Sequence, residues 1–292
     1  MINSPGTDRD ILIHKAYAND ELLAVRQRTH ELYSIPKVNF TEWVLDRVAW
    51  QGNETVLDIG AGPGTYFSLV KARIPHGVLI GGDLSLGMAY RALQHPDVDL
   101  VLNADAQILP FADNTFDVVL ANHMLYHLPN LDAALADIQR ILKPTGRLIA
   151  ATNSQYNLPE FDQLFRRAYG LLGAVGPDVE PMRSTAHNFH LEDGAMKLSH
   201  HFFAVARYDL PGAFVFPSVQ PALDYINSTR ALREPQLPRR IAWDDFMSVM
   251  SDQIQRLINH FGELMVNKLS GVLIATDRGD FAQDYVERLG RD

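Results

Sequence analysis

The sequence contains no cysteine, so disulfide bridges and thiolate metal sites are excluded over its 292 residues. No apolar run approaches the roughly 18 residues that a membrane-spanning helix needs. The polar stretch 1–10 also lacks the pattern of a signal peptide. We therefore expect a cytoplasmic protein without a membrane span. Basic residues are scarce as well: 26 Lys and Arg against 35 Asp and Glu give a formal net charge of -9. This balance argues against a nucleic-acid partner.

The remaining composition is that of an ordinary globular protein, with 47% hydrophobic and 21% charged residues. The most informative stretch is VLDIGAGPGT, residues 56–65. Apolar strand formers run into glycines at every second position, namely Gly60, Gly62 and Gly64. Glycine allows positive φ and lets a ligand lie against bare backbone. A helix beginning near Thr65 would direct free N–H groups at that ligand. The stretch therefore predicts a strand, a ligand-binding turn and a helix.

Strands and helices alternate around this turn. We predict strands at 55–59, 78–82, 99–103, 116–121 and 147–152, and helices at 65–73, 85–94 and 131–142, the last of them followed by a turn at 143–146. Such an alternation, with near-continuous apolar strands, indicates a parallel sheet covered by helices on both faces. Outside this region we expect helices at 11–33, 40–49, 158–172, 191–198, 221–232 and 243–261, and strands at 201–208 and 271–276.

The glycine spacing is G-x-G-x-G, with Asp58 two residues before the first glycine, and not the G-x-G-x-x-G of dinucleotide folds. It resembles motif I of the class I S-adenosylmethionine-dependent methyltransferases. The segment NHMLYHL (122–128), with Pro-Phe and Phe-Asp pairs before it and RILKPTG after it, is similar to the small-molecule enzymes related to the ubiquinone and menaquinone methyltransferases. Thr145 is the one departure, because a second glycine is commoner there. The resemblance is specific over about residues 52–153.

The resemblance implies a fold. It is α/β, with a Rossmann-like, seven-stranded, mostly parallel sheet in the order 3-2-1-4-5-7-6 and an antiparallel last strand. We assign 201–208 and 271–276 to strands six and seven, and 154–190 and 209–268 to insertions over the active-site edge. The predicted organisation is an N-terminal helical segment (1–50), an S-adenosylmethionine-binding core (51–153), a helical lid around strand six (154–268), and a last strand with a C-terminal tail (269–292).

Ligands of open parallel sheets bind beyond the carboxyl ends of the strands. Asp83 ends the second predicted strand, where a carboxylate can accept from both ribose hydroxyls. Capping of the helix next to Ser85 is its alternative role. The resemblance implies that Asp105 and the main chain of Ala106 meet the adenine, and an ordinary loop aspartate is the alternative there.

The sulfur end of the cofactor is expected near Asp58, because a carboxylate suits its ammonium group. Leu84 and Met88 either lie under the adenine or belong to the core. The complete set of predicted cofactor-binding residues is Tyr17, Asp58, Gly60, Ala61, Gly62, Asp83, Leu84, Met88, Asp105, Ala106 and Asn122.

Two histidines follow the fourth predicted strand, and His123 and His127 are the candidate catalytic residues. Four positions apart, they would share one face of a helix. Imidazole has an ordinary pKa of about 6.5, so either is able to take a proton from an acceptor. A structural role is the alternative for both. A zinc pair would lack the glutamate of H-E-x-x-H and a third ligand, so we expect no metal.

The predicted function is methyl transfer to an O, N or C atom of a small metabolite. The reaction is an in-line displacement at the sulfonium methyl of S-adenosyl-L-methionine, with S-adenosyl-L-homocysteine as product. Candidate substrate contacts are Tyr33, His187 and Phe189. The alternatives are an NAD-dependent oxidoreductase, which the glycine spacing disfavours, and a non-catalytic S-adenosylmethionine-binding module. A monomer or a homodimer is expected.

Overall fold

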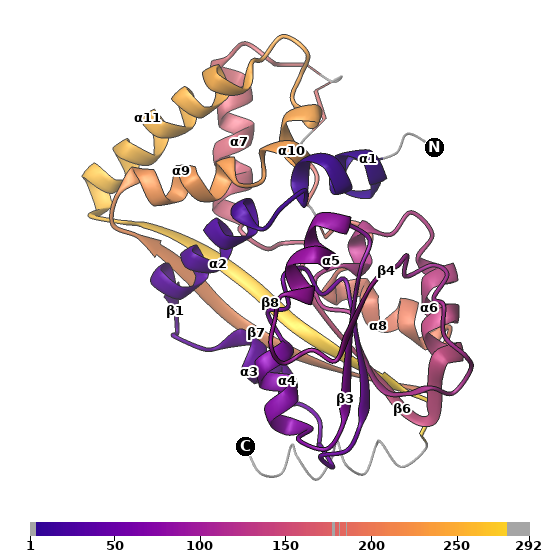
Figure 1. The fold of residues 1–292 in the computed structure, drawn as a ribbon. Helices are drawn as coiled ribbons and strands as arrows, with labels where there is room; N and C mark the ends of the chain where they lie inside the picture. Colours follow the sequence, from indigo (N-terminus) through magenta and orange to yellow (C-terminus); the bar gives the residue numbers. More distant parts are fainter. Residues whose placement is uncertain (1–3, 177–178, 181, 185, 279–292) are drawn as a thin grey trace.

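The computed structural model describes residues 4–176, 179–180, 182–184 and 186–278, and within them eight strands form one sheet (Figure 1). The strand order is β1-β7-β8-β6-β5-β2-β3-β4. The five strands from β4 to β6 are parallel, whereas β8 runs antiparallel to both β6 and β7. The strands are β1 Ser34–Ile35, β2 Thr55–Ile59, β3 Val78–Asp83, β4 Leu100–Asn103, β5 Phe116–Leu120, β6 Leu142–Asn153, β7 Ala204–Phe216 and β8 Leu264–Thr276.

The seven predicted strands occur in the predicted order, and the antiparallel last strand is confirmed. The eighth strand, β1, was not predicted. It pairs Ser34 and Ile35 with Phe214 and Ala213 of β7. Two residues are too few to show the alternation of a strand in the sequence.

Helices occupy both faces of the sheet and its ends. They are α1 Arg9–Ile11, α2 Glu21–Tyr33, α3 Phe40–Leu45, α4 Phe67–Arg73, α5 Leu86–Leu93, α6 Leu131–Ile141, α7 Pro159–Leu171, α8 Leu191–Ser199, α9 Val219–Asn227, α10 Arg230–Arg233 and α11 Trp243–Phe261. A π-helical turn, η2 Leu12–Ala16, follows α1, and short 3₁₀ turns are η1 Pro5–Thr7, η3 Leu125–His127 and η4 Glu234–Gln236. Among the described residues, none of these helices combines the length and apolar character needed to cross a membrane.

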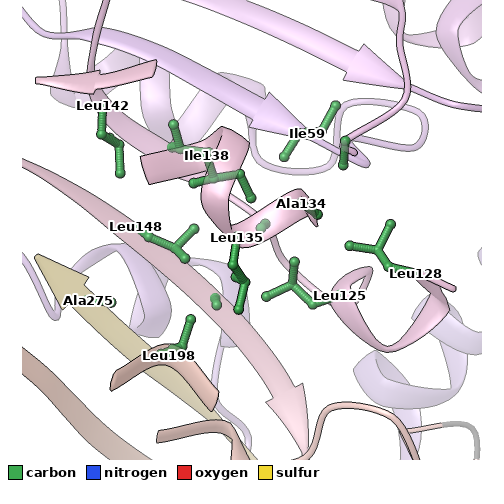
Figure 2. Packing of buried hydrophobic residues seen from close by; sticks show 14 of the residues in the cluster. Ile59, Leu125, Leu128, Ala134, Leu135, Ile138, Leu142, Leu148, Leu198 and Ala275 are labelled. Carbon is green, nitrogen blue, oxygen red and sulfur yellow. The ribbon is translucent and has the colours of Figure 1, made fainter. Parts of the chain in front are cut away.

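The core of the sheet lies in two layers, one on each face. Figure 2 shows part of the first layer, in which Leu135 and Ile138 of α6 pack with Leu148 of β6 and Leu198 of α8. The second layer places α3 and α4 against the opposite side of β2, β5 and β6. Because both faces are covered, the strands are apolar along nearly their whole length, as in β2 (TVLDI).

The last two strands extend much further than predicted. β7 and β8 pair continuously from Ala204 and Thr276 to Phe216 and Leu264, 13 residues each. They run from the sheet to a group of helices at the top of Figure 1. There α7, α9 and α11, which we call the helical cap, form a core of their own with the far ends of both strands. The predicted insertion at 209–268 therefore begins and ends inside paired strands.

Two further boundaries differ from prediction. The residues 143–146, expected as a turn, belong to β6, because Leu142 already pairs with Phe116 and the register with β5 shifts before Val118. The helix expected over 11–33 is broken between η2 and α2, at residues 17–20. Asp8 begins the first part by accepting from the N–H groups of Asp10 and Ile11.

Candidate cofactor and active site

The glycine turn follows β2 at the carboxyl edge of the parallel strands. Gly60, Gly62 and Gly64 have φ of +72°, +57° and +90°, a region that favours glycine. The Gly60 and Ala61 N–H groups donate to the Gly82 carbonyl, at 2.7 and 3.1 Å. A side chain on Gly60 would place its Cβ 2.7 Å from Met124. The turn thus requires glycine for its conformation and for its close packing.

Helix α2, which precedes the turn in the sequence, packs against it. A Cβ built on Gly62 would lie 3.6 Å from Leu23, which is an ordinary van der Waals contact. The Gln27 amide donates to the Thr65 hydroxyl at 2.9 Å. The main chain at Gly62 is therefore covered by a side chain of α2 without being blocked by it. The sequence contained no signal for this arrangement.

Asp83 joins the glycine turn to the next strand end. Its Oδ2 accepts from the Gly62 N–H at 2.9 Å, and its Oδ1 accepts from the Ser85 N–H at 2.8 Å. Burial raises the pKa of the Asp83 carboxyl, and the two hydrogen bonds oppose that shift. The N-cap of α5 is Ser85, whose side chain accepts from the Met88 N–H. Capping is thus done by the serine, and the carboxylate of Asp83 remains placed at the strand end.

Asp58 is the most deeply buried carboxyl of the site, with 1% of its surface exposed. Its Oδ2 has no hydrogen-bond partner within the described part of the chain. Burial raises the pKa of Asp58 to about 8, and the nearby Asp83 adds to the shift. A buried acceptor without a donor is unfavourable. A cationic ligand group at this position would satisfy it.

Asn122 lies just past the end of β5, the neighbour of β2. Its Oδ1 accepts from the Ala151 N–H at 2.9 Å, which fixes the amide. Its Nδ2 is buried and has no acceptor among the described residues. Two polar atoms without partners, Asp58 Oδ2 near the end of β2 and Asn122 Nδ2 just past β5, thus lie on adjacent parallel strands. Buried polar atoms are usually paired, so this edge has the character of a ligand site.

Asp105 follows β4 and is already engaged. Its Oδ2 accepts from Arg9 Nη1 at 2.7 Å, and its Oδ1 accepts from the Gln107 N–H at 3.0 Å. The other predicted adenine residues differ in exposure: Ala106 and Met88 are buried, at 4% and 1%, whereas Leu84 is half-buried. Met88 therefore has the burial of a core residue.

The N-terminal segment, residues 5–17, is tied across these strand ends by His127. The Tyr17 hydroxyl donates to His127 Nε2 at 3.0 Å, and His127 Nδ1 donates to the Gly6 carbonyl at 2.7 Å. The Tyr17 carbonyl also accepts from Ser85 Oγ at 2.8 Å. Burial lowers the pKa of His127 to about 4. Both ring nitrogens are thus used in holding the segment, which matches the structural alternative for this histidine.

His123 does not share a helical face with His127, which corrects the prediction. It precedes η3 and has a φ of +55°, a conformation outside the helix. Its ring lies 5.4 Å from that of Phe40, and burial lowers its pKa to about 4. The imidazole is therefore neutral at physiological pH. Within the described ranges, no group of three or more His, Asp or Glu side chains is arranged to hold a metal ion.

The three predicted substrate contacts do not lie together. Phe189 is fully buried in the core beneath the sheet, so we do not retain it as a substrate contact. Tyr33, at the end of α2, packs against Phe216 at the helical cap, with ring centroids 5.3 Å apart. His187 lines a small cavity together with Gly6 and Tyr126. The sequence places these residues in loops and helix ends, where no local rule decides what they face.

The profile of a methyltransferase domain matches residues 57–150. A demethylmenaquinone methyltransferase of Clavibacter sepedonicus is 32% identical over 171 residues, which are 57% of this chain and 67% of that protein. A ubiquinone/menaquinone biosynthesis C-methyltransferase of Desulfotalea psychrophila is 32% identical over 142 residues, 46% of this chain and 56% of that protein. The chain spans about half the length of most of the curated relatives it matches.

Among solved structures, the phosphoethanolamine N-methyltransferase 2 of Haemonchus contortus in complex with S-adenosyl-L-methionine has a TM-score of 0.55. Its sequence is 16% identical, and the match covers 92% of this chain and 60% of that one. At this identity the likeness shows a shared fold.

Proposed function

The chain belongs to the class I S-adenosylmethionine-dependent methyltransferases, and on this basis we propose that it methylates an oxygen, nitrogen or carbon atom of a small metabolite. The product of the cofactor would be S-adenosyl-L-homocysteine. The matched region, 57–150, contains the glycine turn and the strand ends described above. The acceptor is selected outside it, by the N-terminal segment, α2 and the helical cap. The quinone substrates named for the relatives are therefore one class within a wider range of candidates.

The observation that carries the proposal is a pair of buried polar atoms without partners, at the ends of the two strands next to the glycine turn. Asp58 Oδ2 and Asn122 Nδ2 both lack a hydrogen-bond partner among the described residues, and Asp58 would become an acceptor once it releases its proton to bind a cation. An amino acid moiety offers both an ammonium group and a carboxylate. The carboxyl of Asp58 and the amide N–H of Asn122 therefore fit the ammonium and the carboxylate of the methionine part of S-adenosylmethionine.

Residues at the next two strand ends complete the proposed cofactor site. The carboxylate of Asp83 is held toward the glycine turn and would accept from the ribose hydroxyls. Asp105 would accept from the adenine amino group in place of one of its present donors, because Arg9 and the main-chain and side-chain N–H groups of Gln107 already use its acceptor positions. The bound cofactor supplies an electrophilic methyl group on a sulfonium. Aligning the acceptor and excluding water are the tasks left to the chain.

We expect the Asp83→Ala variant to bind S-adenosylhomocysteine about 1–3 kcal/mol more weakly, because the ribose hydroxyls lose their acceptor. Calorimetric titration measures the change. The matched control is Ser85→Ala, which removes the cap of α5 and the contact to Tyr17 but leaves the carboxylate. An equal loss of S-adenosylhomocysteine affinity in the two variants would mean that Asp83 acts only by ordering the loop between β3 and α5.

His123 is the residue we propose as the general base for the acceptor. Its neutral imidazole is able to accept a proton, and with a pKa of about 4 it stays neutral as the pH falls from 8 to 5. We expect the His123→Asn variant to lower the turnover number several-fold while leaving cofactor affinity unchanged. Asparagine tolerates the φ of +55° at this position, so the backbone is preserved. Equal losses of turnover and cofactor affinity would remove His123 from the role of base.

The acceptor class is tested by incubating the purified chain with labelled S-adenosylmethionine and a panel of phenols, quinols and amines. Transfer of label to any member supports the proposal. Cofactor binding without transfer to any member would favour the non-catalytic binding module.

A further inference from the structure

Arg26 has a guanidinium group that is only half used. It lies on α2, and its Nη1 donates to the Ser228 carbonyl at the end of α9, at 2.9 Å. Its Nη2 is buried, and no acceptor lies within hydrogen-bond distance among the described residues. Leaving a buried charged donor unpaired is unfavourable in free energy. Anchoring α2 to α9 therefore accounts for one of the two terminal nitrogens and leaves the other unexplained.

The positive charge of Arg26 lies near residues of the proposed active site. The Arg26 Cζ lies 5.5 Å from the ring centre of Tyr17, and Tyr17 is also close enough to Asp83 to be affected by its charge. The same guanidinium acts on the pKa of His127 after β5, and on that of Tyr225 in α9. Arg26 thus lies near residues of the N-terminal segment, of the loop after β5 and of the helical cap.

A second cation, Lys268, lies close to His30, whose pKa is lowered by burial and, in addition, by both Lys268 and Arg26. Lys268 Nζ on β8 is 2.6 Å from Ser34 Oγ and 3.3 Å from His30 Nδ1. It also lies 4.8 Å from the ring centre of Phe214. The His30 ring is 4.8 Å from Phe214 and 6.4 Å from Tyr225. The rings of His30, Phe214 and Tyr225 thus lie near one or both of these cations.

No carboxylate neutralises these two cations. Within the part of the chain that the structure describes, neither Arg26 nor Lys268 has an Asp or Glu oxygen within 4.0 Å, although other basic residues are paired, such as Arg9 with Asp105 and Arg140 with Asp137. The chain as a whole has a net charge of -9. Two cations without acidic partners, next to aromatic rings, form a region suited to an anion that comes from outside the protein.

We propose that Arg26 Nη2 binds an acidic group of the methyl acceptor, a carboxylate or a phosphate, and that the acceptor is therefore an anionic small molecule. This inference rests on the proposed function, because it names the substrate class of the same site. Nη1 is anchored on the Ser228 carbonyl, and Nη2 is free to donate charge-assisted hydrogen bonds to a carboxylate or phosphate oxygen. Lys268 contributes to the same positive field from β8.

The experiment compares two anionic probes with a neutral one, benzamide, which has the shape of benzoate. Chain saturated with S-adenosylhomocysteine is titrated calorimetrically with benzoate, with benzamide, and with phenyl phosphate. We expect wild type to bind benzoate or phenyl phosphate at least about tenfold more tightly than benzamide, as for hydrogen bonds to charged groups. The tighter of the two anions identifies the acidic group. We expect Arg26→Gln to lose this preference and Arg26→Lys to keep part of it.

The matched control is Arg28→Gln, two positions along the same helix, where the side chain is exposed. It removes the same charge and should keep the preference of wild type. A merely structural role of Arg26 predicts a different result: Arg26→Gln would lower the melting temperature, and the benzoate-to-benzamide ratio would stay unchanged. That result would overturn the inference. So would equal affinities of wild type for the anions and for benzamide, or no binding of either anion to wild type. Failure of wild type to bind S-adenosylhomocysteine would count against the proposed function instead.

Discussion

Replacing Gly62 by valine is expected to abolish detectable binding of S-adenosylhomocysteine while the chain still folds. The Gly62 main chain lies at the centre of the proposed cofactor seat, and its N–H group is bonded to Asp83. The nearest atom to a Cβ at this position is Leu23 Cδ2 at 3.6 Å, so the Cβ itself fits, and the added valine side chain would occupy the space through which a ligand reaches the backbone. The φ of +57° adds a strain of about 1–2 kcal/mol for any residue other than glycine.

Two alanine variants separate the effect of backbone strain from the loss of the cofactor-binding site. Gly62→Ala adds only the Cβ and should weaken binding by about tenfold or more, which corresponds to about 1.4 kcal/mol. Gly173→Ala is the control, because Gly173 follows α7 with a φ of +73° and has no atom within 4 Å of a built Cβ. Both alanine variants should lose similar stability in thermal unfolding, and only the one at position 62 should lose affinity. Unchanged affinity in Gly62→Val would place the ligand elsewhere.

The second large effect is expected from Asp58→Asn, which should weaken S-adenosylhomocysteine binding by about 2–5 kcal/mol. That range is typical when one partner of a buried, hydrogen-bonded charge pair is removed. Asp58 has an unmet oxygen in the described structure, and the ligand ammonium is the group proposed to meet it. Asp132→Asn is the control, because that side chain is 82% exposed and lies outside the site. Calorimetric titration of both variants with S-adenosylhomocysteine measures the difference. Equal affinities of the two variants would mean that Asp58 does not bind the cofactor.

Asp58 also predicts how the stability of the ligand-free chain depends on pH. Its pKa is raised from 3.8 to about 8 by burial, so the folded state holds a proton that the unfolded state has already released. Stability therefore falls as the pH rises from about 4 to about 8, by roughly 1.36 kcal/mol per unit for this group. The Asp58→Asn variant should gain stability relative to wild type over that window. Denaturant unfolding at pH 5 and pH 8 measures the change, and a pH-independent difference would contradict the buried protonated carboxyl.

The parts of the fold that were predicted correctly have local causes. The strand at 55–59 is bounded by polar residues and a glycine turn, and α11 has the predicted limits of 243–261 because an apolar face repeats along it. The extension of β7 was missed because Pro211-Gly212 is typical of a turn. In the structure both residues are paired with β8, and Gly212 allows the carbonyl of Ile35 in β1 to approach.

The candidate site divides in the same way. Asp58 and Asp83 lie at the ends of the paired strands β2 and β3, and parallel strand ends meet at one edge, so their proximity was predictable. The partner of His127 at Gly6 is 121 positions away, so no spacing in the sequence indicated it. Arg26 was missed for the same reason, since the end of α9 that it contacts is brought to it by the helical cap.

The central claim is that the glycine turn, together with Asp58 and Asp83, forms the binding site for S-adenosylmethionine. It is tested most directly by calorimetric titration of the wild-type chain with S-adenosylhomocysteine, with NAD titrated in parallel. We predict saturable binding of one S-adenosylhomocysteine per chain and no heat from NAD. Saturable binding of NAD together with no binding of S-adenosylhomocysteine would contradict the account.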